Sequence, residues 1–208
     1  LPMAVDVYVG ANKQRHQIIL KDSVQTFSFL GPTKPDLVNV DADKVLLAEK
    51  TDNKSLAEFA FQYANAPLYL DRLEAVLAAV KAPSDTESAK ILTAALNDKY
   101  YGIRLNALQA IDPSNTALLS SMMPAIRKMA VNDVNTLVQA QAITMLASAK
   151  NQDDLAMFRK GLESRSYAVQ GASLMALADL IPPAEALSIA KGLEKDNRKA
   201  LTVAIVNV

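Results

Sequence analysis

The spacing of apolar residues changes once along the chain, near residue 50. Before that point the apolar positions alternate, with Met3, Val5, Val7 and Val9 on one face of an extended segment. After it they recur every three to four positions, which is the spacing of an amphipathic helix. Strands bury alternate residues and helices bury a stripe, so the change predicts a β portion followed by an α portion.

Polar turns divide the first part into four or five short strands, of which the last two are expected to pair across Asp41 and Asp43. The expected strands span residues 3–9, 15–20, 24–30, 37–40 and 45–47. Short antiparallel strands of this kind suggest most of a β-sandwich. We therefore expect an α+β fold, mainly α, with an antiparallel β-sandwich portion over residues 1–48 and a helical domain over residues 49–208.

Helix start signals punctuate the second part of the chain. Ser55 with Glu58, and Ser84 with Glu87, fit the capping box, in which the serine and glutamate side chains each bind a free backbone N–H. Alanine supports the change of structure, because only four of the first 50 residues are Ala against thirty of the other 158. The expected helices are short and closely linked, so neighbouring helices should be antiparallel.

An internal repeat runs through these helices. Its anchor residues are Arg72, Arg104, Gln139, Gln170 and, in a possible fifth copy, Arg198, at steps of 32, 35, 31 and 28 residues. A small residue follows each of the middle anchors, at Ala107, Ala142 and Ser173. One step is one helical hairpin, so the repeat predicts an α–α superhelix of stacked hairpins, HEAT- or ARM-like.

Composition narrows the chemistry. Lys plus Arg (22) equals Asp plus Glu (22), which argues against nucleic acid as a partner. The longest apolar run has six residues, against about 20 for a membrane span, so none is expected. The chain has no cysteine and one histidine, His16, so thiolate chemistry is excluded and a zinc site is disfavoured. These counts argue against an autonomous enzyme.

A few residues invite a functional interpretation, each with a structural alternative. His16 would be a general base or metal ligand, and the alternative is a surface residue of a strand. Asp41 and Asp43 resemble half of a calcium loop, but the other ligands of such a loop are absent, which favours a plain turn. Four tyrosines could line a peptide groove or simply pack at the ends of hairpins: Tyr63, Tyr69, Tyr100 and Tyr101.

Arg72 and Arg104 occupy matching repeat positions and are the principal candidate site residues. One interpretation has them face a groove and bind a substrate carboxylate with two parallel hydrogen bonds. The other, which the sequence favours, has them pair with the chain's own carboxylates, such as Asp71, Glu74 or Asp112, and fix the helix stack.

The junction between the two parts resembles a known family. The resemblance rests on residues 34–47 (KPDLVNVDADKVLL), 58–63 (EFAFQY) and 66–75 (APLYLDRLEA). These segments look like the end of the β-sandwich and the start of the helical C-terminal domain in aminopeptidase-N-like gluzincin metallopeptidases. In that family a catalytic zinc domain comes earlier in the chain. The opening Leu1-Pro2-Met3, without an initiator Met or signal peptide, likewise leads us to expect a fragment of a longer protein.

The resemblance implies a non-catalytic C-terminal segment that shapes substrate access and supports an upstream catalytic domain. Its partners would be that domain and, through the parent, a peptide substrate. Zinc would belong to the parent protein, since this chain has no H-E-x-x-H and no G-x-M-E-N motif. The resemblance therefore implies no catalytic residue and no cofactor in this chain. In some relatives a basic residue helps to hold the far end of the peptide, which makes Arg104 the position to test. The alternative is a protein-interaction scaffold from a peptidase-like protein that has lost its zinc site.

Overall fold

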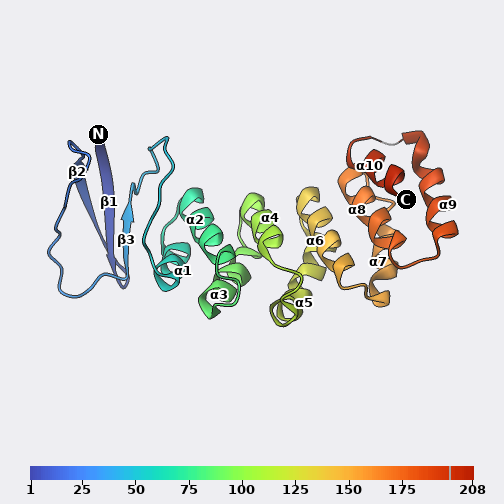
Figure 1. Cartoon of the computed structure of the whole chain (residues 1–208), viewed down its shortest axis with the longest axis horizontal. Coiled ribbons are helices and arrows are strands. Elements are labelled where there is room, and N and C mark those ends of the chain that lie inside the picture. The colour runs from blue at the N-terminus through green and yellow to red at the C-terminus, as the bar shows by residue number, and fades with distance from the viewer. Residues whose placement is uncertain (197) are drawn as a thin grey trace. The chain divides into compact units, whose positions relative to one another are not determined.

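The computed structural model describes residues 1–196 and 198–208. The chain forms two compact units, residues 1–91 (unit 1) and residues 92–208 (unit 2). Unit 1 contains all the strands of the described residues and the first helices, and unit 2 is helical (Figure 1). The expected boundary between residues 48 and 49 stays a prediction.

Unit 1 is built on a small antiparallel sheet with the strand order β2-β1-β3. Its elements are β1 (Pro2–Val9), β2 (Asn12–Ile19), β3 (Leu37–Val40), α1 (Leu56–Asn65), α2 (Tyr69–Val80) and α3 (Thr86–Ala95), the last of which continues into unit 2. Val5 of the central strand lies opposite His16 on one side and Val40 on the other. Met3, Ala4, Val5 and Asp6 are all buried, so both faces of β1 are covered.

The expected β-sandwich is wrong. The described residues contain one sheet of three strands, while helices make up 56% of the chain. The helical part of the expected fold class is compatible with the structure, because no strand occurs among the described residues after β3.

Residues 24–30 explain part of this error. They keep an alternating pattern of burial, with Phe27 and Phe29 partly buried against the cluster of Met3, Val5 and Ile18. The segment nevertheless makes no ladder with another strand and is not a strand itself. Alternating burial indicates an extended segment with one buried side, whereas a strand also requires backbone hydrogen bonds to a neighbouring strand.

Residues 45–47 fail as a strand for a different reason. Asp41 has a φ of 54° and Lys44 a φ of 52°, so the backbone turns sharply within this segment. The Asp41 carboxylate accepts hydrogen bonds from the backbone N–H groups of Val45 (3.0 Å) and Leu46 (3.2 Å). With those donors used by a side chain, β3 pairs with β1 instead of with residues 45–47.

The two expected capping boxes have different outcomes. At α1, the Ser55 backbone N–H donates to the Glu58 carboxylate at 2.7 Å and the Glu58 N–H donates to Ser55 Oγ at 3.3 Å, which confirms the first box. At α3, the Glu87 N–H donates to the carboxylate of Asp85 at 2.7 Å. Asp85 therefore caps this helix in place of Ser84, which the sequence predicted as the cap.

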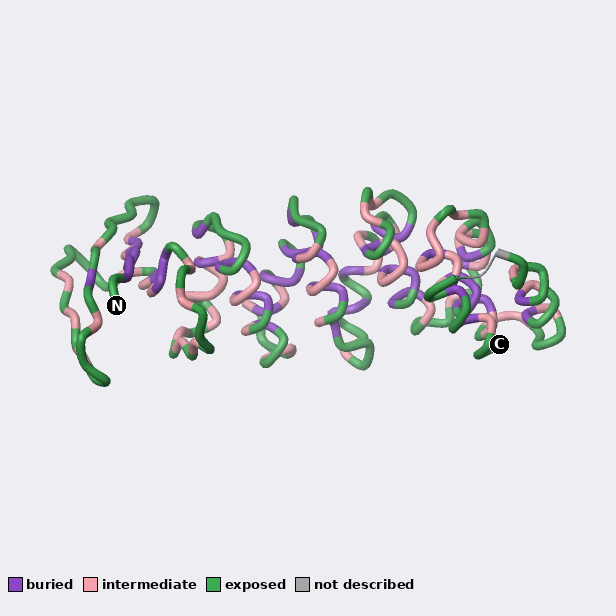
Figure 2. Tube along the Cα trace, turned by 90° about the horizontal axis from the view of Figure 1, so that it is seen from above, coloured by how far each residue is buried: buried purple, intermediate pink, exposed green. Residues whose placement is uncertain are grey.

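Unit 2 continues as a series of short helices joined by short connections. Its elements are α4 (Tyr101–Ala110), α5 (Thr116–Asn132), α6 (Thr136–Ser148), η1 (Gln152–Asp154), α7 (Leu155–Gly161), α8 (Tyr167–Ala178), α9 (Pro183–Leu193), η2 (Glu194–Asp196) and α10 (Ala200–Asn207). Consecutive second helices of the hairpins, α4, α6, α8 and α10, lie next to one another. Figure 2 shows buried helical segments alternating with exposed turns along this unit.

Small residues lie where these helices approach closely. Ala107, Ala142 and Ser173 are fully buried, as the repeat predicts. Gly171 permits a close approach of two helix backbones: a Cβ atom there would lie 2.8 Å from the carbonyl oxygen of Ala200, at the start of α10. Any larger residue at this position would push α10 away from α8.

Ala142→Leu should destabilise the protein by about 1–3 kcal/mol, because a fully buried alanine in a packed stack has no room for three more carbon atoms. Urea unfolding followed by circular dichroism measures the change. Ala156→Leu, on the exposed side of α7, is the matched control and should change stability by no more than about 0.5 kcal/mol. Equal stability of Ala142→Leu and the control would contradict the close packing at residue 142.

Candidate functional site

Arg104 already holds one of the protein's own carboxylates. Its Nε and Nη2 atoms donate to Oδ2 and Oδ1 of Asp133, each at 2.7 Å, and its Nη1 donates to the carbonyls of Asp98 (2.7 Å) and Lys99 (3.2 Å). The side chains of Arg104 and Asp133 are only 10% and 6% exposed. Four of the five guanidinium N–H groups therefore have partners, and a substrate carboxylate would have to displace Asp133.

The Arg104–Asp133 pair is charged at neutral pH. Burial alone would raise the pKa of Asp133, but the hydrogen bonds from Arg104 and from the backbone N–H of Asn135 lower it on balance. The same hydrogen bond to Asp133 raises the pKa of Arg104. The interpretation of Arg104 as a structural ion pair thus agrees with the geometry, although its partner is Asp133 and not Asp112.

The other repeat anchors hold the chain in the same way. Arg72 Nη1 donates to the carbonyl of Pro67 at 2.7 Å, Gln139 Nε2 to that of Asp133 at 2.7 Å, and Gln170 Nε2 to that of Leu162 at 3.1 Å. Each accepting carbonyl belongs to the connection just before the anchor's own helix, as in the bond from Arg104 to Asp98. The repeat therefore marks a position that fastens each second helix to its connection. Arg198 lies before α10 and is exposed, so it does not share this role.

A network of three lysines and three carboxylates lies in unit 1. The ion pairs join Lys44 to Asp71 (2.9 Å) and Glu74 (3.0 Å), Lys50 to Glu74 (3.0 Å) and Asp52 (3.1 Å), and Lys54 to Asp52 (2.8 Å). Asn39 Nδ2 of β3 also donates to Asp71 at 2.9 Å. Because residues 41–54 form no helix or strand, these contacts are what hold the segment against α2.

Burial and charge act against each other in this network. Burial would raise the pKa of Glu74, but the ammonium groups of Lys44 and Lys50 lower it on balance. Burial would likewise raise the pKa of Asp52, and Lys54 and Lys50 lower it. For Lys54 burial is the stronger effect, and its pKa is lowered. These residues stabilise one another's charges and leave no carboxylate of the network without a cation.

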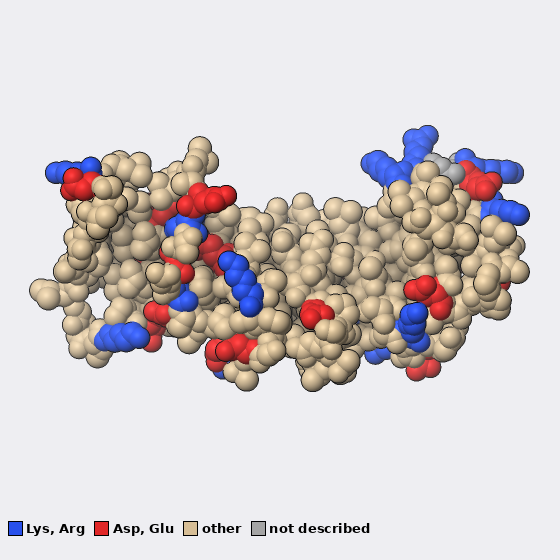
Figure 3. All heavy atoms as spheres, in the orientation of Figure 1, with Lys and Arg blue, Asp and Glu red and all other residues tan. Residues whose placement is uncertain are grey.

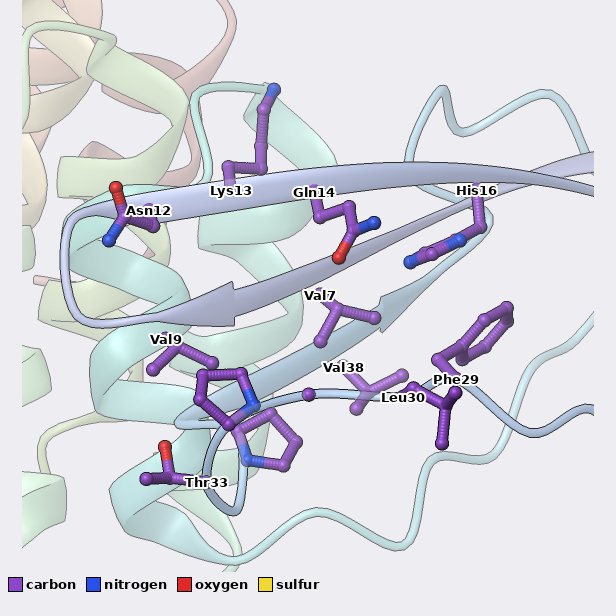
Figure 4. A pocket seen from close by; sticks show the side chains of 13 residues that line it. Val7, Val9, Asn12, Lys13, Gln14, His16, Phe29, Leu30, Thr33 and Val38 are labelled. Carbon is purple, nitrogen blue, oxygen red and sulfur yellow. The ribbon is translucent and has the colours of Figure 1, made fainter.

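The candidate residues of the sheet have structural contacts. The ring of His16 stacks on Phe29, with ring centroids 4.2 Å apart, at a cavity of about 270 Å³ that Val7 and Val38 also line (Figure 4). Asp43 pairs with Arg15 at 2.8 Å, and the Asp41 carboxylate binds the backbone, which agrees with a plain turn.

The four tyrosines divide between the units. Tyr63 and Tyr69 belong to unit 1, whereas Tyr100 and Tyr101 belong to unit 2. The rings of Tyr100 and Tyr101 lie 4.9 Å apart and remain partly exposed. The contact between Tyr100 and Tyr101 is packing of neighbouring rings, and the tyrosine-lined groove stays an untested alternative.

A groove that the sequence did not indicate runs over unit 2, with a volume of about 500 Å³. The helices α6, α8 and α10 each contribute four residues spaced i, i+3, i+4 and i+7, beginning at Leu137, Ala168 and Ala200 respectively, and α4 adds Leu105 and Gln109. None of the 14 lining residues is charged. The face shown in Figure 3 is mostly uncharged over α4 and α6. The signal in the sequence was the recurrence of small and neutral residues at these spacings.

Two general findings concern the part of the chain that the structure describes. None of its helices is long and apolar enough to cross a membrane. No three or more of its His, Asp and Glu side chains gather where they could hold a metal ion.

A scan against models of known protein families and a search of curated proteins found no match to this chain. The comparisons do not identify an aminopeptidase-N-like segment. That resemblance enters the proposal below on its residues alone.

Arg104→Met should destabilise the protein by about 3–5 kcal/mol, because it leaves the buried Asp133 carboxylate without its cation. The double variant Arg104→Met with Asp133→Asn should be more stable than Arg104→Met, since it removes the stranded charge. Denaturant unfolding of the wild type, both single variants and the double variant measures this coupling. Strictly additive effects would show that the pair does not act as a unit.

Acid should destabilise the protein through the lowered carboxylate pKa values. A group whose pKa is lower in the folded state stabilises the fold above its unfolded pKa, here the ordinary 4.5 for Glu74 and 3.8 for Asp133, and this stability is lost as the pH falls through the folded pKa. The free energy of unfolding should therefore fall between about pH 5 and pH 3, and less steeply in Glu74→Gln. A flat profile would contradict the lowered pKa values.

Proposed function

We propose that this chain is the non-catalytic, helical-repeat C-terminal segment of an aminopeptidase-N-like zinc metallopeptidase. In this proposal it shapes substrate access and supports a catalytic domain that lies upstream and carries the zinc. The observation that carries the proposal is the resemblance of residues 34–47, 58–63 and 66–75 to the junction in that family.

The contacts made by those residues support the proposal. The three segments cover β3 and the residues that follow it, part of α1 and the start of α2, and side chains from them bind one another. Asn39 and Lys44 both contact Asp71, and the Gln62 amide donates to the carbonyl of Asp71 (2.9 Å) and the carboxylate of Glu74 (2.8 Å). The resembling residues thus form one interdependent joint between the sheet and the first hairpin.

The contribution of this chain to catalysis would be geometric. Zinc, when bound by the parent, would supply the Lewis acid for peptide hydrolysis, and no step of that chemistry falls to residues of this chain. A wall of stacked hairpins limits which peptides can reach a site that it borders, and it fixes the position of a bound chain.

Arg104 and Arg72 remain predicted contacts for a substrate carboxylate. The geometry sets a condition on this role, because Arg104 would have to exchange Asp133 for the substrate. In the parent enzyme, Arg104→Ala would then raise KM for peptides with a free carboxylate more than for amide-blocked peptides. Equal effects on both would leave Arg104 with its structural role alone.

The alternative is a protein-interaction scaffold that has lost its zinc site. The uncharged groove of unit 2 favours this alternative, because Leu137, Met175 and Val203 are all exposed there. The two proposals differ in what the parent protein contains.

The deciding experiment examines the parent protein. We expect the coding sequence upstream of Leu1 to contain H-E-x-x-H with a downstream glutamate, and the purified parent to hydrolyse aminoacyl-p-nitroanilides. Deleting residues 92–208 should change its preference for peptide length more than its rate on such a small substrate. A parent without the zinc motif, or without aminopeptidase activity in the presence of zinc, would overturn the peptidase proposal and leave the scaffold.

A further inference from the structure

The groove of unit 2 differs from the rest of the surface in its chemistry. About a fifth of the chain is charged, yet α4, α6, α8 and α10 line the groove with 14 residues of which none carries a charge. A charged partner group would lose its water there without meeting an opposite charge. The groove therefore favours a neutral occupant.

Its floor and its apolar side chains suit a polypeptide. Small residues such as Ala140 and Ala172 let a chain lie close to the helices. Leu137, Met175 and Val203 project among them, exposed by 52%, 39% and 62% of their surface. Burying these side chains against apolar side chains of a partner would stabilise the complex.

Three amide side chains decide which form that polypeptide takes. Gln109, Gln141 and Asn207 line the groove, and in the described part of the chain none of their side-chain amides has a hydrogen-bond partner. An amide both donates and accepts, so it can bind the N–H and C=O groups of a peptide backbone. A helix has already satisfied those groups internally, whereas an extended segment presents them free.

We propose that the groove formed by α4, α6, α8 and α10 binds an extended, uncharged polypeptide segment with small and apolar side chains. Gln109, Gln141 and Asn207 bind its backbone, and Leu137, Met175 and Val203 contact its side chains. This site lies apart from Arg104, which is occupied by Asp133, and the proposal does not depend on a peptidase parent.

The test uses the whole chain, residues 1–208, and a fluorescent ten-residue peptide of Ala, Val, Thr, Ser and Pro, acetylated and amidated at its ends. Fluorescence anisotropy should show saturable binding of this peptide. Two control peptides, in which Glu or Lys replaces alternate residues, should bind at least tenfold more weakly. No binding, or equal binding of all three peptides, would overturn the proposal.

Two sets of variants locate the site. Gln109→Met with Gln141→Met keeps size and neutrality but removes the amides, and should weaken binding about tenfold. Ala140→Asp, which places a charge in the groove, should weaken it further, whereas Ser120→Asp on the exposed side of α5 should leave it unchanged. Thermal unfolding checks that each variant is folded. Binding that survives both groove variants would exclude this site.

Other occupants give distinct results. Sedimentation that shows a dimer dissociated by Ala140→Asp would assign the groove to a second copy of the chain. Binding to phosphatidylcholine vesicles that the same substitution abolishes would assign it to a lipid surface. Either result would overturn the proposal of an extended peptide.

Discussion

A carboxylate taken out of water must be met by a cation or by hydrogen-bond donors, and this requirement joins the parts of each unit. Four aspartates with almost fully buried side chains show it. Arg15 of β2 meets Asp6 of β1, Lys44 of the loop meets Asp71 of α2, Arg104 of α4 meets Asp133, and Arg127 of α5 meets Asp154. Each pair joins two different segments of the chain. Losing the cation would deprive a buried carboxylate of its principal partner, so the pairs specify which segments lie together.

The same requirement applies to backbone carbonyls at the connections of the hairpins. The anchors reach back five residues at Arg72, six at Arg104 and Gln139, and eight at Gln170 to find their carbonyls. Long side chains can span these different distances, so connections of different length are tolerated between similar hairpins. This explains how the repeat keeps its packing while its spacing in the sequence stays uneven.

Within unit 2, the buried ion pair of Arg104 and the proposed binding groove therefore lie at different places. Arg104, for which ligand binding was the less favoured of two sequence interpretations, is occupied in holding the fold. The exposed faces of α4, α6, α8 and α10 carry no charge and offer side-chain amides. A wall that narrows access to a catalytic site and a groove that holds an extended segment are compatible uses of one helical stack. The network of Lys44, Lys50 and Lys54 in unit 1 has the structural task of fixing the joint between sheet and helices.

The sequence by itself determined the features that depend on near neighbours along the chain. The helical period after residue 50, the capping box at Ser55 and the burial of Ala107, Ala142 and Ser173 follow from local spacing and side-chain size. Only the tertiary structure decided the rest. Residues 24–30 alternate like a strand but pair with neither edge of the sheet, and Asp133 becomes the partner of Arg104 from 29 positions away. The sequence did not predict the groove, because the row of uncharged residues on a single helix resembles a solvent-exposed face. The groove exists only where neighbouring helices bring several such rows side by side. Pairing and grooves require that distant segments meet, and no local pattern contains that information.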